Sequence, residues 1–398
     1  MSVAFESPLG SFVIRDDLLA PYRDELASEE DSTPVRLVYA AAHLVMESEY
    51  ATVTHCLESP VLAADLTDHI DWDATFALRQ RLDSLGFGIA EAMDTAQRFQ
   101  IGWDNAIRLI EGCGALGLRN GFVAGAGVDH LSTIADEDSL VEGVIFQARA
   151  IRTAGGIPIL LPLAWLCQQG YQEEDYVRVY GRILSGLETP VFLHWLGEMF
   201  LPELAGYFPG ASFSRIMADN SAKLRGAKLS LLDASLERRL RSEIAHRDQI
   251  LLTGDDFNFA GLISGDPPTG NTTIDGRQVP TGEFSHGLLG IFDGIAEPAS
   301  LALRFLARGN AERYDDLMDP CERLSRHLFG APTRHYKAGL AFLAWLNGDQ
   351  GNPMLVQHEE RARTPQHYVQ AARLASEAGI FRDAELTAER LREFLGSA

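Results

Sequence analysis

The sequence predicts an α/β fold, a (β/α)₈ TIM barrel with a C-terminal helical extension. Short apolar runs that do not alternate with polar residues occur eight times, and such runs are typical of strands buried on both faces of a parallel sheet. Segments of helical period separate them, and from residue 86 onward the runs recur at about 34 residues, the length of one βα unit. An open doubly wound sheet is the alternative, but no G-x-G-x-x-G follows the first run.

The predicted strands share a short length and a high content of Val, Ile, Leu, Phe or Gly. They are 35–42, 86–90, 121–126, 157–166, 190–196, 224–232, 249–254 and 287–292. Between them, 103–117 and 140–156 have apolar residues at helical spacing. The Gly-Gly pair that closes the second of these helices suits a helix C-terminus.

Three other segments complete the predicted architecture. About 50 residues separate the starts of the first two strands, which leaves room for an additional helix or loop. The insert 264–286 is rich in Gly, Pro and Thr, and we expect a lid or an interface loop there. After residue 296 the pattern is wholly helical, with Thr364 as an N-cap before Pro365. We therefore expect an N-terminal segment at 1–33, the barrel at 34–297, and the last barrel helix with a helical domain at 298–398.

Composition limits the classes of partner. The 398 residues carry a net charge of −22, from 34 Lys and Arg against 56 Asp and Glu. This balance argues against nucleic acid and against an anionic membrane surface as partners. No apolar run is long enough to span a bilayer, and the N-terminus lacks the features of a signal peptide, so we expect a cytoplasmic protein. The four cysteines are scattered without a C-x-x-C pair, so neither disulfides nor a zinc site are expected.

Polar residues gather where the predicted strands end, the face at which barrel enzymes carry their chemistry. We expect substrate-binding roles for six of them: His43, Glu91, Asp94, Asp129, Trp195 and Asp255. Each also has a structural interpretation. A core histidine, a helix cap or a pocket wall would use the same residue types. His286, on the turn-rich insert, is expected to be exposed.

Lys228 is the most informative of these polar residues. It is one of three lysines in the chain and lies inside the apolar run LRGAKLSLL, where burying a charge is costly. A lysine in a desolvated pocket becomes nucleophilic and forms a Schiff base with a carbonyl compound. The alternative is a lysine that pairs with a barrel carboxylate such as Asp255.

Several segments resemble the dihydrodipicolinate synthase and N-acetylneuraminate lyase superfamily of class I aldolases. The resemblance covers roughly residues 34–320. In its length and altered motifs the sequence is similar to an uncharacterised subfamily that is described only as dihydrodipicolinate-synthase-like. The segments that carry it are GFVAGAG (121–127), PVFLHW (190–195), GAKLSLLDASLERRLR (226–241), ILLTGDDFNFAGLISG (250–265) and GLLGIFDGIAEPASLALRFLARGNAERYDDL (287–317). The resemblance implies that Lys228 is the Schiff-base lysine and that the protein forms a homodimer or homotetramer.

Departures from the family's pattern affect the substrate. His194 stands where the family has a tyrosine that relays protons, and an imidazole can shuttle protons near pH 7. Glu91 and Asp94 lie where the family has T-T-G-E, a turn that holds the carboxylate of a 2-oxo acid. Two carboxylates would repel such a substrate, and a neutral, sugar-derived carbonyl compound fits them better.

The sequence thus predicts a lyase, aldolase or dehydratase that acts on a small carbonyl compound through Lys228, with His194 moving protons and with no cofactor or resident metal. Two alternatives stay open at this point. A divalent metal held by His43, Glu91, His194 and Asp255 would give a metal-dependent aldolase, isomerase or hydrolase. A catalytically degenerate barrel that only binds a sugar is the other.

Overall fold

The computed structural model describes residues 2–28, 35–60, 62–93, 95–244 and 248–397. Across this part of the chain there are two compact units. One consists of Met1–Thr33, Ala42–Phe87 and Gly290–Ala398, and the other of Pro34–Ala41 and Gly88–Leu289. Because both units are assembled from separate stretches of sequence, they do not coincide with the three consecutive segments predicted above, whose borders stay a prediction.

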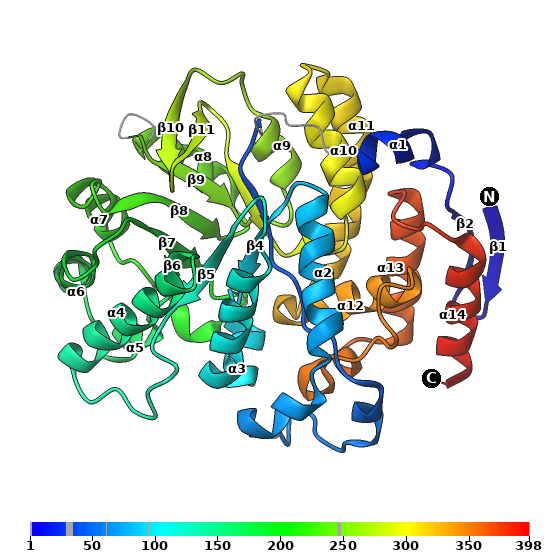
Figure 1. Ribbon diagram of the computed structural model, residues 1–398, viewed down its shortest axis with the longest axis horizontal. Helices are drawn as coiled ribbons and strands as arrows, with labels where there is room; N and C mark the ends of the chain where they lie inside the picture. Colours follow the sequence, from blue (N-terminus) through cyan, green and yellow to red (C-terminus); the bar gives the residue numbers. More distant parts are fainter. Residues whose placement is uncertain (1, 29–34, 61, 94, 245–247, 398) are drawn as a thin grey trace. The chain divides into compact units, whose positions relative to one another are not determined.

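The second unit is a closed barrel of parallel strands, and the predicted (β/α)₈ barrel is confirmed (Figure 1). Within the described residues the strands follow the order β12-β3-β4-β5-β6-β7-β8-β9 around the barrel. Each falls on a predicted apolar run. The strands are β3 (Val38–Ala40), β4 (Gly88–Glu91), β5 (Phe122–Ala126), β6 (Ile157–Leu160), β7 (Val191–Leu196), β8 (Leu224–Ser230), β9 (Ile250–Thr253) and β12 (His286–Leu289).

The barrel interior is filled by apolar side chains from alternate positions of the strands. Tyr39, Ala90, Val123, Phe192 and Leu252 belong to one buried cluster there. Residues that alternate with them face the surrounding helices, because successive side chains of a strand point to opposite faces. This alternation decides which polar residues at the strand ends enter the barrel.

Helices connect the strands of this unit. They are α3 (Thr95–Ala115), α4 (Glu137–Thr153), α5 (Ala164–Gln168), α6 (Glu173–Ser185), α7 (Ser212–Asp219), α8 (Ala234–Ile244) and α9 (Phe259–Ser264), with the short η4 (Pro202–Leu204) before α7.

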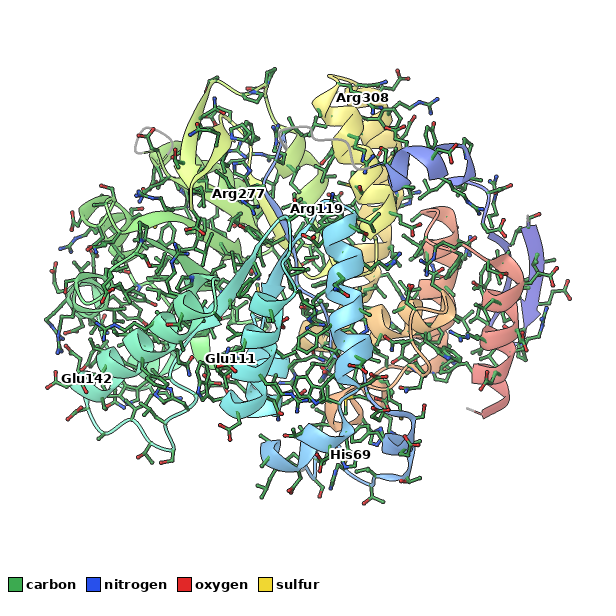
Figure 2. The ribbon with its side chains drawn as sticks, in the orientation of Figure 1. His69, Glu111, Arg119, Glu142, Arg277 and Arg308 are labelled. Atoms are coloured by element: carbon green, nitrogen blue, oxygen red, sulfur yellow. The ribbon has the colours of Figure 1, made fainter. Side chains whose placement is uncertain are left out.

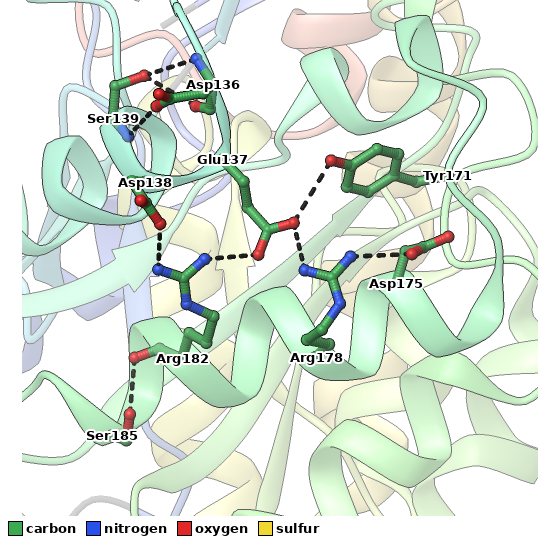
Figure 3. Close-up of polar contacts among 9 residues, drawn as sticks. All are labelled: Asp136, Glu137, Asp138, Ser139, Tyr171, Asp175, Arg178, Arg182 and Ser185. Atoms are coloured by element: carbon green, nitrogen blue, oxygen red, sulfur yellow. Dashed lines mark hydrogen bonds and ion pairs between the residues drawn. The ribbon is translucent and has the colours of Figure 1, made fainter.

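Ion pairs tie neighbouring helices of this layer together. Glu137, in the first turn of α4, accepts hydrogen bonds from Arg178 and Arg182 of α6, and Asp138 also pairs with Arg182 (Figure 3). Burial would raise the pKa of Glu137, but the two guanidinium groups hold it below its usual value. Part of the acidic surplus therefore serves helix packing.

The insert 264–286 forms a β-hairpin, which the sequence did not predict. Its strands β10 (Gly270–Ile274) and β11 (Arg277–Thr281) pair in an antiparallel register. Ile274 and Val279 join the interior cluster of the barrel, so the hairpin packs with one face on the barrel core.

The expectation that His286 is exposed was wrong. Its side chain is only 1% exposed. Its Nδ1 accepts a hydrogen bond from the Leu37 backbone (2.8 Å), and its Nε2 lies 3.0 Å from the Pro280 carbonyl oxygen. These two contacts link β12, β3 and the hairpin. The composition of the insert gives no sign of this structural role.

The first unit is mainly helical and confirms the predicted C-terminal helices. From Gly290 on it contains η6 (Ile291–Asp293), α10 (Ala296–Ala307), α11 (Ala311–Leu328), η7 (Thr333–His335), α12 (Lys337–Leu346), η8 (Val356–Ala362), α13 (Pro365–Glu377) and α14 (Ala384–Ser397). The Thr364 side chain caps α13 by accepting a hydrogen bond from the His367 backbone, as expected.

N-terminal segments complete the first unit. They are β1 (Ser2–Ser7), β2 (Gly10–Arg15), η1 (Ala20–Tyr22), α1 (Arg23–Ala27), η2 (Ser48–Thr52), η3 (Ala63–His69) and α2 (Trp72–Ser84). Strands β1 and β2 form a hairpin, and the Arg15 backbone of β2 donates to Ser376 of α13. Among the helices that the structure describes, none combines the length and apolar composition that a membrane span requires.

Candidate functional site

Lys228 lies on β8 directly beside His194 of β7. The two residues are paired in the parallel register, as are Lys228 and Leu252 of β9. Phe192 and Leu252 belong to the interior cluster, so the side chains of His194 and Lys228 share the inner face of the barrel. The two predicted catalytic residues are therefore neighbours on the same face.

An irregularity in the strand pairing gives Lys228 this orientation. Leu224 pairs with Val191, but Gly226 pairs with Phe192, so β8 carries one extra residue at this point. Such a bulge reverses the face to which all later side chains of the strand point. As a result Gly226, Lys228 and Ser230 face inward together with Phe192.

Two glycines make room for the lysine. A Cβ atom at Gly226 would lie 1.9 Å from the carbonyl oxygen of Ile250, so only glycine allows β8 and β9 to approach here. A Cβ atom at Gly254 would lie 2.3 Å from Ser230 Oγ and 2.8 Å from Lys228 Cε. The aliphatic part of Lys228 therefore packs on the Gly254 backbone.

His194 is held as a neutral imidazole. Its side chain is 1% exposed, and its Nε2 lies 3.3 Å from Ser230 Oγ. Burial, and to a lesser degree the nearby charge of Lys228, lower the pKa of His194 well below its usual value. Its Nδ1 is buried and has no hydrogen-bond partner among the described residues. At neutral pH the ring is therefore uncharged, and its two nitrogens offer one hydrogen-bond donor and one acceptor beside Lys228.

Glu91 points away from the barrel interior. Its neighbour Ala90 belongs to the interior cluster, and Glu91 Oε2 accepts a hydrogen bond from the Cys113 thiol of α3 (3.1 Å). Since β4 alternates, the carboxylate is directed to the helix layer, where it is 1% exposed. Asp94, the second acidic residue predicted at this strand end, lies outside the described residues.

Asp129 forms a bidentate ion pair instead of an open binding group. Arg98 of α3 donates from Nε (2.7 Å) and Nη2 (3.0 Å) to its two carboxylate oxygens, and Gln147 of α4 adds a third hydrogen bond. Burial raises the pKa of Asp129, but the Arg98 charge and these bonds outweigh it and lower the pKa. Its negative charge is neutralised within the helix layer.

Trp195 and Asp255 also have structural partners. Trp195 follows the inward-facing His194 and packs against Phe208 and against Phe213 of α7, at ring-centroid distances of 5.3 and 5.0 Å. Asp255 closes the turn before α9, because its Oδ1 accepts from the backbone of residues 257 and 258 and its Oδ2 from the Asn258 side chain. Both side chains thus have partners within the protein, and their substrate-binding roles stay a prediction.

His43 lies in the first unit, three residues after β3. Its Nδ1 is 2.7 Å from Asp293 Oδ2 and its Nε2 is 2.6 Å from Gln350 Oε1. Lys337 Nζ lies 3.9 Å from the same oxygen of Asp293. Both ring nitrogens of His43 are thus engaged by the protein, which leaves none for a substrate hydroxyl.

The metal alternative finds no support in the contacts of its residues. Glu91 faces α3, and Asp255 is bonded within its own turn. Over the described ranges, no group of three or more His, Cys, Asp and Glu side chains is placed to hold a metal ion.

Comparisons with known proteins give a family and a fold. The family model described as "Protein of unknown function (DUF993)" matches residues 17–398. The chain belongs to this family. No protein of curated function matches the sequence.

Solved structures of dihydrodipicolinate synthases share the fold. The enzyme of Aquifex aeolicus superposes with a TM-score of 0.60 at 9% identity, covering 87% of this chain and 98% of its own. The chloride-inhibited enzyme of Acinetobacter baumannii, complexed with pyruvate, gives 0.60 at 14% identity, covering 87% and 100%. The Bacillus clausii enzyme gives 0.59 at 12%, covering 86% and 97%. At these identities the likeness concerns the fold, and it agrees with the resemblance found in the motifs.

Ser230 is the site residue that the sequence analysis of this DUF993 member missed. It is 2% exposed and lies within hydrogen-bonding distance of His194. Its spacing of two from Lys228 is the signal that was available, because positions i and i+2 of a strand share a face. The described site is thus a lysine, a neutral histidine and a serine on two adjacent strands, with Gly254 beside them.

Proposed function

We propose that the protein is a Schiff-base-forming lyase or aldolase that acts on a small carbonyl compound. The observation that carries this proposal is the placement of Lys228 on the inner face of the barrel, in register with a buried, neutral His194. The fold shared with dihydrodipicolinate synthases supports the same class of chemistry. No metal or cofactor takes part in the proposed reaction.

In the proposed reaction the neutral amine of Lys228 attacks the substrate carbonyl carbon to form a carbinolamine. The amine gives up one proton and the catalytic site supplies a second, so the carbonyl oxygen leaves as water and a protonated imine remains. This iminium then accepts the electron pair released when a bond at the neighbouring carbon breaks. His194 moves the protons, and Ser230 orients its ring through Nε2.

The structure alters the argument on substrate charge. Glu91 faces the helix layer and Asp129 is neutralised by Arg98, so neither carboxylate repels an anionic substrate in the barrel. That part of the expectation for a substrate without a carboxylate therefore loses its basis. The proposed substrate is a small carbonyl compound, and the experiment below compares 2-oxo acids with ketoses. The homodimer or homotetramer implied by the resemblance stays a prediction.

Borohydride trapping tests the proposal. The full-length protein is incubated with single 2-oxo acids or ketoses, reduced, digested and examined by mass spectrometry. The chain has only three lysines, so a reduced adduct is assigned without ambiguity. We expect an adduct on Lys228 with at least one compound and its absence in K228A.

Lys223 provides the matched control. It enters the same strand, and its Nζ donates to the Leu187 carbonyl (2.5 Å) at the amino end of the barrel. K223R is expected to retain trapping at Lys228. An adduct on Lys223 or Lys337 instead, or turnover that persists in K228A, would refute the assignment of Lys228 as the nucleophile.

A further inference from the structure

A cavity of about 230 Å³ lies at the amino end of the barrel. It adjoins Phe122 and Ile157, the first residues of β5 and β6, whereas Lys228 lies in the carboxyl half of β8. All its lining residues belong to the unit that contains the barrel. It is therefore separate from the site proposed above, and nothing in the proposed reaction uses it.

The β10–β11 hairpin supplies one wall of the cavity. Ile274 and Val279 line it together with Leu37 and Ile157 from the barrel. Arg277, at the hairpin turn, also lines it and donates from Nη2 to the Arg119 carbonyl (2.6 Å) (Figure 2). The cavity thus combines an apolar wall with a cationic group held in place by a backbone contact.

Arg277 carries a charge that its surroundings do not neutralise. It makes no ion pair with a carboxylate of the described residues, although the chain has an excess of acidic groups. The nearest acidic residue in sequence, Asp275, is paired with Arg152. A guanidinium group that lines a cavity without a counter-charge is a binding group for an anion.

Tyr39 adds a polar group to the wall of the cavity. Its side chain lines the cavity and is 3% exposed, and its hydroxyl can donate one hydrogen bond. Burial raises the pKa of this hydroxyl, while the charges of Arg277 and Asp275 act on it in opposite directions. The hydroxyl is therefore protonated at neutral pH, within electrostatic range of the hairpin turn.

We infer that this cavity binds a small aliphatic monocarboxylate. Arg277 and the Tyr39 hydroxyl hold the carboxylate, and the tail packs against Leu37, Ile157 and Val279. The volume exceeds the roughly 150 Å³ that suffices for benzene and is below that of drug-sized pockets. A ligand of about six to ten non-hydrogen atoms fits this range.

Hexanoate is the probe for this inference, with hexanamide as its uncharged counterpart. Binding is measured by calorimetry and by the shift in melting temperature, on the wild-type protein and on K228A, so that a contribution from the proposed catalytic lysine is seen separately. We expect saturable binding of hexanoate to both proteins. Hexanamide should bind at least about tenfold more weakly, since it lacks the charge that Arg277 recognises.

Variants of the two polar groups give the decisive comparison. R277Q should weaken hexanoate binding at least about tenfold, and Y39F by about threefold to tenfold, because each removes a hydrogen bond to the carboxylate. R313Q, at an exposed arginine of α11, serves as the matched control and should leave binding unchanged. Arg277 is exposed on a hairpin, so its substitution is compatible with folding.

Three outcomes would overturn the inference: no saturable binding up to about 10 mM hexanoate, equal affinity of hexanoate and hexanamide, or unchanged affinity in R277Q. Binding that is lost in K228A but kept in R277Q would place the acid at the proposed catalytic lysine, which also overturns it. Failure of borohydride trapping at Lys228 leaves the expected results at Arg277 unchanged, so the two proposals fail independently.

Discussion

Glu237 is expected to make the protein less stable as the pH rises through neutrality. It lies on α8, is 2% exposed, and accepts hydrogen bonds from Thr253 Oγ1 (3.0 Å) and Ser285 Oγ (2.6 Å). Burial raises its pKa from 4.5 to about 7, with a smaller contribution from the charge of Asp255, while the two hydroxyl donors and Arg241 oppose the shift. The carboxyl group therefore connects α8 to β9 and to the segment before β12, mostly in its neutral form below pH 7.

The sign of the effect follows from proton linkage. Between pH 4.5 and about 7 the native state binds more protons at Glu237 than the unfolded chain does, so the free energy of unfolding falls as the pH rises. Each unit of pKa shift corresponds to about 1.4 kcal/mol. A rise from 4.5 to about 7 thus corresponds to about 3 kcal/mol, lost by about pH 8.

E237Q isolates the contribution of Glu237 ionisation to the free energy of unfolding, because glutamine keeps the size and an oxygen acceptor but does not ionise. Urea unfolding of E237Q and wild type is followed by circular dichroism between about pH 5 and about pH 8. The difference in unfolding free energy should shift by about 3 kcal/mol in favour of E237Q over this range. E142Q, at an exposed glutamate of α4 (Figure 2), should show no such shift. Parallel curves for E237Q and wild type would refute the reasoning.

Two further predictions concern a glycine of the site and a buried histidine. G254A should slow borohydride trapping at least about tenfold, since its Cβ would displace Lys228 Cε and misplace the proposed nucleophile. G261A is the control and should not slow trapping, because its Cβ would have only Arg238 within 4 Å, at 3.9 Å. Equal trapping rates in the two variants would contradict this role of Gly254. Burial lowers the pKa of His286 from 6.5 to about 3. Between these two pH values the unfolded chain binds more protons at this residue than the native state does, so the free energy of unfolding falls as the pH falls. Relative to H286Q, the wild type should therefore lose about 2 kcal/mol between about pH 6.5 and about pH 4.5 in urea unfolding, and a constant difference would contradict this prediction.

The strands of the barrel were predictable because their signal is local. A strand buried on both faces shows as a short apolar run, and each predicted run overlaps a barrel strand. The hairpin in 264–286 was not predictable in the same way. Its strands alternate weakly, and Ile274 and Val279 are buried only because the barrel end lies against them.

Lys228 could be singled out because a charge inside an apolar run is unusual, whatever the fold. The sequence does not show which other polar residues at the strand ends lie beside Lys228. Glu91 and Asp129 occupy strand ends like His194, yet they face α3 and Arg98 and not the barrel interior. Residue type and position along a strand do not distinguish these cases.

The sequence by itself determined the number and order of the buried strands, the helical C-terminal part, and the one lysine that lies inside an apolar strand. Only the tertiary structure decided which side chains enter the barrel. The reason is that the facing of a strand residue depends on its register with the neighbouring strand, about 34 residues away in sequence. A single extra residue in β8, before Gly226, is enough to turn Lys228 and Ser230 inward.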